Sequence, residues 1–185
     1  MLRFENKVAL VTGGSRGIGE GVVREFVKAG ARVAFCARGV VAGHALENEL
    51  NQKGPGECFF IQCDVREEIQ IKRTIEETVA KYTQLDCLVN NAAWHPPEQT
   101  IDDVSVEQFT ELIKYNVVNY FVFCKIALPH LRKTNGNIIN VSSHVAKMGE
   151  LSSIPYISTK CFSGQYLDTP VERGCRFFGR SGGND

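Results

Sequence analysis

A tyrosine and a lysine four residues apart, Tyr156 and Lys160, are the side chains whose types and spacing point most directly to chemistry. On a helix, residues four apart share a face, so a phenol and an ammonium would be neighbours. A free phenol has a pKa of about 10, and a nearby positive charge lowers it by favouring the phenolate. We therefore expect Lys160 to lower the pKa of Tyr156 and to make it usable for proton transfer near neutral pH.

A glycine-rich stretch near the N-terminus, Thr12-Gly13-Gly14-Ser15-Arg16-Gly17-Ile18-Gly19, is the second motif with a chemical use. Gly13 permits a turn that a side chain would block, and Gly17 and Gly19 let the backbone approach a pyrophosphate. The charge of such a ligand would meet the positive end of the helix that follows. The alternative is a glycine-rich turn without a ligand, but the position between a strand and a helix favours a dinucleotide site.

Five short apolar runs alternate with amphipathic stretches and supply the elements that must position these motifs. The predicted strands cover 7–12, 32–36, 58–63, 85–90 and 136–141, and the predicted helices cover 17–29, 41–52, 67–81 and 105–132. Strands that are almost continuously apolar and are separated by helices predict a parallel sheet covered on both faces. Right-handed crossovers then give a doubly wound, Rossmann-like α/β fold.

Length and composition limit the classes of function. The chain of 185 residues fits one domain, and Lys+Arg and Asp+Glu balance at 21 each, so no net field attracts nucleic acid or an anionic membrane. No apolar run approaches the ~18 residues of a membrane span, and the first residues lack the apolar core of a signal peptide. The seven cysteines are odd in number and form no Cys-x-x-Cys. We therefore expect no metal site or disulfide framework, and a cytoplasmic location.

The regular pattern stops after Lys160. Gly164 and Pro170 stand where a helix would continue, and the last residues are rich in glycine and charge. We predict a folded domain over residues 1–160 and an atypical, poorly ordered tail over 161–185.

Over roughly residues 4–160 the chain resembles the short-chain dehydrogenase/reductase family. The resemblance rests on motifs that occur in the family's order: residues 12–19, Cys63-Asp64-Val65, Asn90-Asn91-Ala92-Ala93, Asn116, Ser142-Ser143, and the pair Tyr156 and Lys160. It implies an NAD(P)(H)-dependent oxidoreductase that interconverts a secondary alcohol and a ketone, with a hydroxysteroid among the candidate substrates.

The resemblance also implies four catalytic residues. Tyr156 would exchange a proton with the substrate oxygen, helped by Lys160 and by the charge of the oxidised nicotinamide. Lys160 would also hold the nicotinamide ribose, and Ser143 would hydrogen-bond the substrate oxygen. Asn116 would hold a water that links Lys160 to solvent; the alternative for Asn116 is a local hydrogen bond within its helix.

The implied cofactor contacts lie at the strand ends. Asp64 would accept the adenine amino group and Val65 would pack beside the ring; a helix N-cap is the alternative for Asp64. The predicted cofactor-binding residues are Gly13, Ser15, Arg16, Gly17, Ile18, Gly19, Arg38, Asp64, Val65, Asn91, Ala92, Tyr156 and Lys160. Ala93 stands where the family usually has glycine, and a positive φ there would strain it.

Cofactor choice depends on the end of the second predicted strand. A carboxylate there would bind the ribose 2′-hydroxyl of NAD and repel the 2′-phosphate of NADP. This chain has Ala37 instead, followed by Arg38, with Arg16 in the glycine turn. Two guanidinium groups favour NADP(H), with NAD(H) as the alternative. His95 and Ser143 are predicted to contact substrate, and Trp94 and His144 are weaker candidates.

The family continues beyond the Tyr156 motif with two further strands that have no counterpart in the predicted elements. Without them the strand over 136–141 becomes an exposed edge, and the homo-oligomer usual in the family is in doubt. Two hypotheses therefore stay open. The chain is an active oxidoreductase on a small-molecule alcohol or ketone, or it is a catalytically silent relative that keeps partial dinucleotide binding or associates with full-length subunits.

Overall fold

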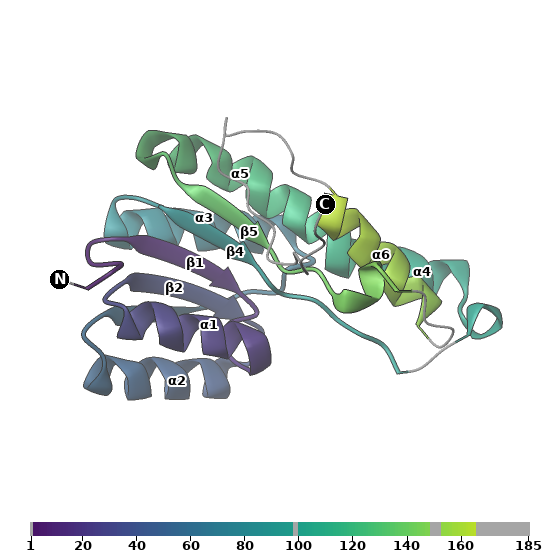
Figure 1. The fold of residues 1–185 in the computed structure, drawn as a ribbon, viewed down its shortest axis with the longest axis horizontal. Coiled ribbons are helices and arrows are strands. Elements are labelled where there is room, and N and C mark those ends of the chain that lie inside the picture. The colour runs from purple at the N-terminus through teal and green to yellow at the C-terminus, as the bar shows by residue number, and fades with distance from the viewer. Residues whose placement is uncertain (1, 98–99, 149–152, 166–185) are drawn as a thin grey trace, which may run out of the picture.

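The protein folds into a five-stranded parallel β-sheet with helices on both faces (Figure 1). The computed structural model describes residues 2–97, 100–148 and 153–165. The strands are β1 (Val8–Thr12), β2 (Arg32–Ala37), β3 (Glu57–Gln62), β4 (Cys87–Asn90) and β5 (Asn137–Asn140). They lie in the order β3-β2-β1-β4-β5, which confirms the doubly wound, Rossmann-like α/β fold.

The five predicted strands are all present, and their bounds differ from the prediction by at most two residues. β1 is buried along its whole length and lies in the middle of the sheet between β2 and β4. A central strand of a parallel sheet is covered on both faces, which is why its sequence is apolar without alternation.

Two helices cover each face of the sheet. Helices α1 (Gly17–Lys28) and α2 (Val40–Lys53) lie on one face, and α3 (Glu68–Tyr82) and α5 (Asn119–Thr134) lie on the other (Figure 1). Each pair packs a separate buried cluster against the strands, with Val23, Val27, Leu46 and Leu50 on the first face and Ile71, Ile75, Phe123 and Leu131 on the second. Each such buried side chain stabilises the fold by about 1.5–3 kcal/mol relative to an exposed one.

The predicted helical region over 105–132 is present, but it is not α-helical throughout. The structure divides this region into α4 (Val106–Ile113), a single π-helical segment (Lys114–Val118) and α5. The wider turn carries Asn116, whose amide bonds to residues far away in the sequence. Helical periodicity does not reveal such a segment, because contacts with other parts of the fold hold it; π-helical turns often mark functional sites.

The last described element, α6 (Ile154–Gln165), carries both Tyr156 and Lys160 and packs beside α4 (Figure 1). It continues past Lys160, so the predicted domain boundary falls inside a helix. Residues 166–185 lie outside the described part of the chain, and the predictions about the tail and the two missing strands stay predictions. Among the helices of the described residues, none is long and apolar enough to cross a membrane.

The sheet has one point at which the strand order reverses. The chain proceeds outward from β1 to β2 and β3, then returns to pair β4 with the other side of β1. Ligands of such sheets bind in the crevice at the carboxyl ends of the strands where the order reverses. The glycine turn follows β1 and the Asn90–Ala93 motif begins at the last residue of β4, so both lie at this point.

Candidate active site

A cavity of about 570 Å³ opens at the carboxyl ends of the strands, at the reversal point of the sheet. That size is within the usual range for small-ligand sites. Three cationic side chains and no carboxylate are found among the described residues of its wall. The lining residues are Gly13, Ser15, Arg16, Gly17, Ile18, Gly19, Ala37, Arg38, Gly39, Ala42, Cys63, Val65, Asn91, Ala92, Ala93, Tyr115, Val141, Ser142, Tyr156 and Lys160. The wall therefore suits an anionic ligand.

The glycine turn is shaped for close backbone approach. Gly13 has a φ of +66°, and a Cβ on Gly19 would lie 2.2 Å from the Gly13 carbonyl oxygen. Gly17, with a φ of +57°, faces open space in which a side chain would meet no atom within 4 Å. Arg16 occupies the N-cap of α1 without a capping hydrogen bond from its side chain. The first amides of α1 are thus available to a phosphate group, and the residues present fit a dinucleotide.

Thr12 connects the glycine turn to the loop after β4, a contact that the sequence reasoning missed. Its buried hydroxyl accepts hydrogen bonds of 2.9 Å from the backbone amides of both Asn91 and Ala92. The Asn91 amide group donates back to the Thr12 carbonyl oxygen at 2.9 Å and to that of Gly13 at 3.3 Å. A threonine as the last residue of a buried strand was the available signal. Ala93 does not have a positive φ, so the anticipated strain is not found.

The pKa of Tyr156 lies above its ordinary value, and the predicted lowering by Lys160 together with an oxidised nicotinamide stays a prediction. Burial raises the pKa of the Tyr156 phenol, and its hydrogen bond with Ser143 offsets only part of that rise. The Lys160 ammonium lies 5.7 Å from the centroid of the Tyr156 ring and donates to the Val141 carbonyl oxygen at 3.0 Å. Lys160 is thus directed at a backbone acceptor, and desolvation determines the pKa of the phenol.

Lys160 is itself almost completely buried, with 2% of its surface exposed. Burial lowers the pKa of its ammonium from 10.5 to about 8. The faces of Tyr120 and Tyr156 lie 5.6 and 5.7 Å from its nitrogen, which is within range of a cation–π contact. A lysine with a pKa near 8 changes its charge readily close to neutral pH, as a group that moves protons must.

Asn116 holds α6 against the loop after β4. Its carbonyl oxygen accepts from the Trp94 amide at 2.8 Å, and its NH₂ group donates to the Trp94 carbonyl oxygen at 2.9 Å and to the Thr159 hydroxyl at 3.1 Å. The alternative of a local bond within its helix does not hold, because these partners lie 22 and 43 residues away. The predicted role of holding a water stays a prediction. Thr159, fully buried beside Lys160, was missed.

His95 lies beside the proton-transfer residues. Its ring centroid is 4.2 Å from that of Tyr156, and its Nε2 is 3.4 Å from the Ser153 hydroxyl. The structure thus brings together Tyr156, Ser143, Lys160 and His95. Ser143, Asn116, Asp64 and His95 are not lining residues of the cavity itself, and Ser143 contacts it through Tyr156.

Arg38 and Tyr115 line the end of the cavity near β2 and β3, and an ion pair lies nearby. Asp64 is ion-paired with Arg66 at 2.6 Å, which lowers the pKa of its carboxyl group. Arg38 lies over the Tyr115 ring at 5.5 Å. The alternative of Asp64 as the N-cap of α3 is wrong, because Glu67 occupies that position. Tyr115 comes from the π-helical segment, and no sequence signal indicated it.

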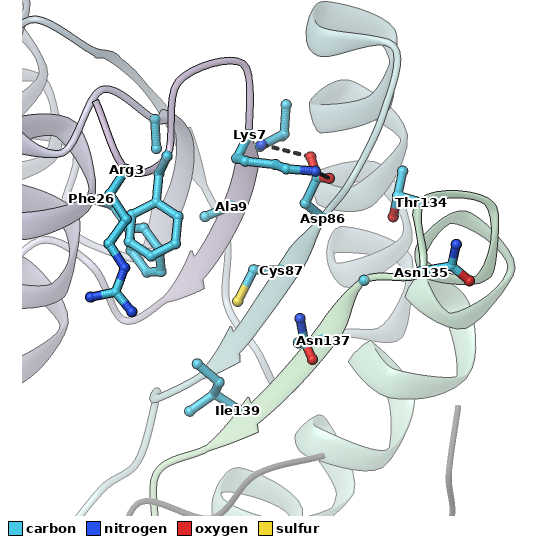
Figure 2. A pocket seen from close by; sticks show the side chains of 14 residues that line it. Arg3, Lys7, Ala9, Phe26, Asp86, Cys87, Thr134, Asn135, Asn137 and Ile139 are labelled. Carbon is cyan, nitrogen blue, oxygen red and sulfur yellow. Dashed lines mark hydrogen bonds and ion pairs between the residues drawn. The ribbon is translucent and has the colours of Figure 1, made fainter. Parts of the chain in front are cut away.

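A second cavity, of about 520 Å³, lies at the opposite, amino ends of β1, β4 and β5. Figure 2 shows Lys7 reaching Asp86 there, an ion pair of 2.9 Å. Asp86 also accepts from the Val8 amide at 2.9 Å, so its carboxylate secures the starts of β1 and β4. None of the predicted site residues line this cavity. Among the described residues, no group of three or more His, Cys, Asp or Glu side chains could hold a metal ion.

Comparison with known proteins agrees with this geometry. The family model described as "short chain dehydrogenase" matches residues 7–169. The chain is 44% identical over 158 residues to the L-fucose dehydrogenase of Bos taurus, a match that covers 85% of this chain and 57% of that protein. The chain therefore spans little more than half the length of this relative.

Two solved structures share the fold. An alcohol dehydrogenase from Thermococcus sibiricus, complexed with 5-hydroxy-NADP, has a TM-score of 0.84 and 27% identity, and the match covers 93% of this chain and 74% of that one. A 7α-hydroxysteroid dehydrogenase complexed with NADH and 7-oxo glycochenodeoxycholic acid has a TM-score of 0.87 and 25% identity, with 95% and 70% covered. Fold, motifs and relatives agree, and this chain belongs to the short-chain dehydrogenase/reductase family.

Proposed function

We propose that the protein is an NAD(P)(H)-dependent oxidoreductase that interconverts a secondary alcohol and a ketone. One observation carries the proposal: a single cavity joins the glycine turn after β1 to Tyr156 and Lys160 on α6. A site for a dinucleotide and a site for proton transfer therefore adjoin, as hydride transfer coupled to protonation requires.

The chain's own residues supply binding and proton transfer, and a bound nicotinamide dinucleotide would supply or accept the hydride. The amides at the start of α1 and the glycine turn would hold the pyrophosphate. Tyr156, hydrogen-bonded to Ser143, would exchange a proton with the substrate oxygen. Lys160, buried next to it, would hold the ribose and pass protons onward.

For the cofactor we favour NADP(H), with NAD(H) as the alternative. Arg16 and Arg38 both line the cavity, and Ala37 lies where a carboxylate would repel a 2′-phosphate. Arg66 is less available to a 2′-phosphate, because it forms an ion pair with Asp64. A calorimetric comparison of NADPH and NADH tests the preference, and tighter binding of NADH would contradict it.

For the substrate we propose a small molecule with a secondary hydroxyl group, either a sugar or a hydroxysteroid. The L-fucose dehydrogenase relative supports the sugar. Short stretches such as Ala31-Arg32-Val33 and His95-Pro96-Pro97 resemble 17β-hydroxysteroid dehydrogenase type 14, which supports the steroid. His95, stacked on Tyr156, is placed to contact either one. We also propose a cytoplasmic location, supported by the free thiols of all described cysteines.

The test is a dehydrogenase assay with a panel of sugars and hydroxysteroids, followed by absorbance of the reduced nicotinamide. Tyr156→Phe keeps the ring and removes the proton, so turnover should fall by about 10²–10⁴-fold while NADPH binding stays unchanged. Phe121→Leu, an exposed position on α5 outside the cavity, serves as the matched control and should retain full activity. Turnover that survives Tyr156→Phe would contradict the assigned role.

The second hypothesis is a catalytically silent relative that binds a dinucleotide or associates with full-length subunits. The same assay distinguishes the two hypotheses. NADPH binding without turnover across the whole panel would favour the silent relative, and saturable turnover would exclude it.

A further inference from the structure

Two cysteine thiols meet next to the cavity, and one of them, Cys63, lines it. Cys36 is the penultimate residue of β2, and Cys63 directly follows β3. Their side chains belong to the same buried cluster and are hydrogen-bonded to each other. The backbone agrees, because the Cys63 amide donates to the Ala37 carbonyl oxygen at 3.0 Å. The two sulfur atoms therefore face one another across adjacent strand ends.

The pair lies between two segments that the cofactor site depends on. Cys63 lines the cavity and is followed by Asp64 and Val65, while Cys36 is followed by Ala37 and Arg38. Cys36 has no exposed surface, and Cys63 has 1%. The cavity is thus the side from which a small molecule reaches the Cys63 sulfur, and a ligand in the cavity would block that approach.

The two thiols differ in reactivity. The hydrogen bond from Cys36 lowers the pKa of Cys63, and the nearby Arg73 guanidinium adds to that effect. The pKa of Cys36 is raised, first by the same hydrogen bond and then by burial. Burial raises the pKa of both Cys58 and Cys87 to about 12. Because the thiolate is the nucleophile, Cys63 is the attacking group and Cys36 its natural partner.

We propose that Cys36 and Cys63 form a reversible disulfide when hydrogen peroxide enters the cavity, and that this disulfide and a bound dinucleotide exclude one another. The Cys63 sulfur attacks one peroxide oxygen, the O–O bond breaks, and a sulfenic acid forms with release of water. The Cys36 sulfur then attacks the Cys63 sulfur, an S–S bond forms, and the hydroxyl group leaves as a second water. Overall, two thiols lose two hydrogens and two electrons, and one hydrogen peroxide becomes two waters.

The disulfide would weaken dinucleotide binding because it forms between two segments that carry cavity-lining residues. A disulfide requires the sulfur atoms to approach to about 2.05 Å, which is closer than two hydrogen-bonded thiols, so the bond would draw the ends of β2 and β3 together. Those ends carry Arg38 and Val65, which line the cavity. Linkage is reciprocal, so a dinucleotide that the disulfide weakens must in turn oppose disulfide formation. This competition rests on the proposed function; the disulfide itself does not.

The experiment treats the full, reduced chain with hydrogen peroxide in the presence and absence of saturating NADPH. Tryptic peptides 33–38 and 54–66 carry Cys36 and Cys63, and fragmentation separates Cys63 from Cys58 in the second peptide. We expect a 33–38/54–66 crosslink at Cys63, formed at least about tenfold more slowly with NADPH present. The oxidised protein should bind NADPH at least about tenfold more weakly, and dithiothreitol should restore binding.

Variants of single cysteines provide the controls. Cys36→Ala and Cys63→Ala should each lose the crosslink, and Cys87→Ala, at a cysteine that does not line the cavity at the carboxyl ends of the strands, should retain it. A crosslink at other cysteines, or Cys63 trapped as sulfinic acid, overturns the disulfide. A correct crosslink with unchanged NADPH affinity overturns the exclusion. Failure of the reduced chain to bind NADPH or NADH refutes the proposed function instead, and the peptide map reports on the disulfide separately.

Discussion

Replacing the buried Lys160 by methionine should make the protein more stable near neutral pH and not at high pH. Methionine keeps the length of the apolar stem and removes a charge that the fold disfavours. The pKa of Lys160 falls from 10.5 in the unfolded reference to about 8 in the fold. At about 1.4 kcal/mol per unit, holding the ammonium costs roughly 3 kcal/mol below pH 8.

The sign of the pH dependence follows from proton counts. Between pH 8 and pH 10.5 the unfolded chain binds more protons at Lys160 than the folded chain does, so wild-type stability rises with pH across this window. Methionine does not titrate. The advantage of Lys160→Met over wild type should therefore shrink by about 2.5 kcal/mol between about pH 7 and about pH 10. The variant also loses the 3.0 Å hydrogen bond from Lys160 to the Val141 carbonyl oxygen, which lowers its free energy of unfolding by about 1 kcal/mol at both pH values.

Urea unfolding followed by circular dichroism at the two pH values measures this difference directly. The contributions of other titrating groups cancel, because only the difference in free energy of unfolding between variant and wild type is compared. Lys28→Met is the matched control: Lys28 is exposed on α1, paired only at 3.4 Å with Glu25, and should change stability by less than about 0.5 kcal/mol at either pH. A gap between Lys160→Met and wild type that is equal at both pH values would refute the argument that burial lowers the pKa of Lys160.

Three further outcomes are expected. Asn116→Ala removes the three hydrogen bonds of a buried side chain and should lower the free energy of unfolding by about 2–4 kcal/mol in urea titrations; a loss below about 1 kcal/mol would contradict its role in holding α6. Gly19→Ala places a Cβ 2.2 Å from the Gly13 carbonyl oxygen and should abolish calorimetric NADPH binding, whereas Gly21→Ala, with no atom within 4 Å, should bind normally. Equal NADPH binding by the two variants would show that the close packing of the glycine turn is not required for the dinucleotide site. Arg38→Gln should weaken NADPH binding about tenfold and NADH binding less than about threefold, and equal losses would remove the arginine from cofactor choice.

The sequence predicted the sheet well because each strand is determined by local composition. A run such as that of β1 must be buried on both faces, and the glycines that follow can only form a turn, so strand, turn and helix are specified within about 20 residues. The family motifs then placed Tyr156, Lys160 and the glycine turn around one cavity, as found.

What the sequence did not reveal depends on contacts between distant segments. The π-helical segment is held by the bonds of Asn116 to Trp94 and Thr159, and Tyr115 reaches the cavity only because that segment widens. In the sequence Thr12 is one more β-branched strand residue. In the structure its hydroxyl accepts hydrogen bonds from two backbone amides of the loop after β4. In each case the functional atom is polar, buried, and satisfied by a partner that no periodicity specifies.

The pKa of Tyr156 determines the protonation state from which the chain's own residues start a proton transfer. Burial raises the pKa of the phenol above its ordinary value, and its hydrogen bond with Ser143 does not reverse that. The phenol is therefore protonated at neutral pH, a state suited to donating a proton to a substrate oxygen and not to accepting one. Lys160, with a pKa of about 8, is able to resupply that proton near neutrality. For the proposed function, alcohol oxidation needs the phenolate and ketone reduction needs the phenol, so oxidation should require a higher pH than reduction in the same buffer series.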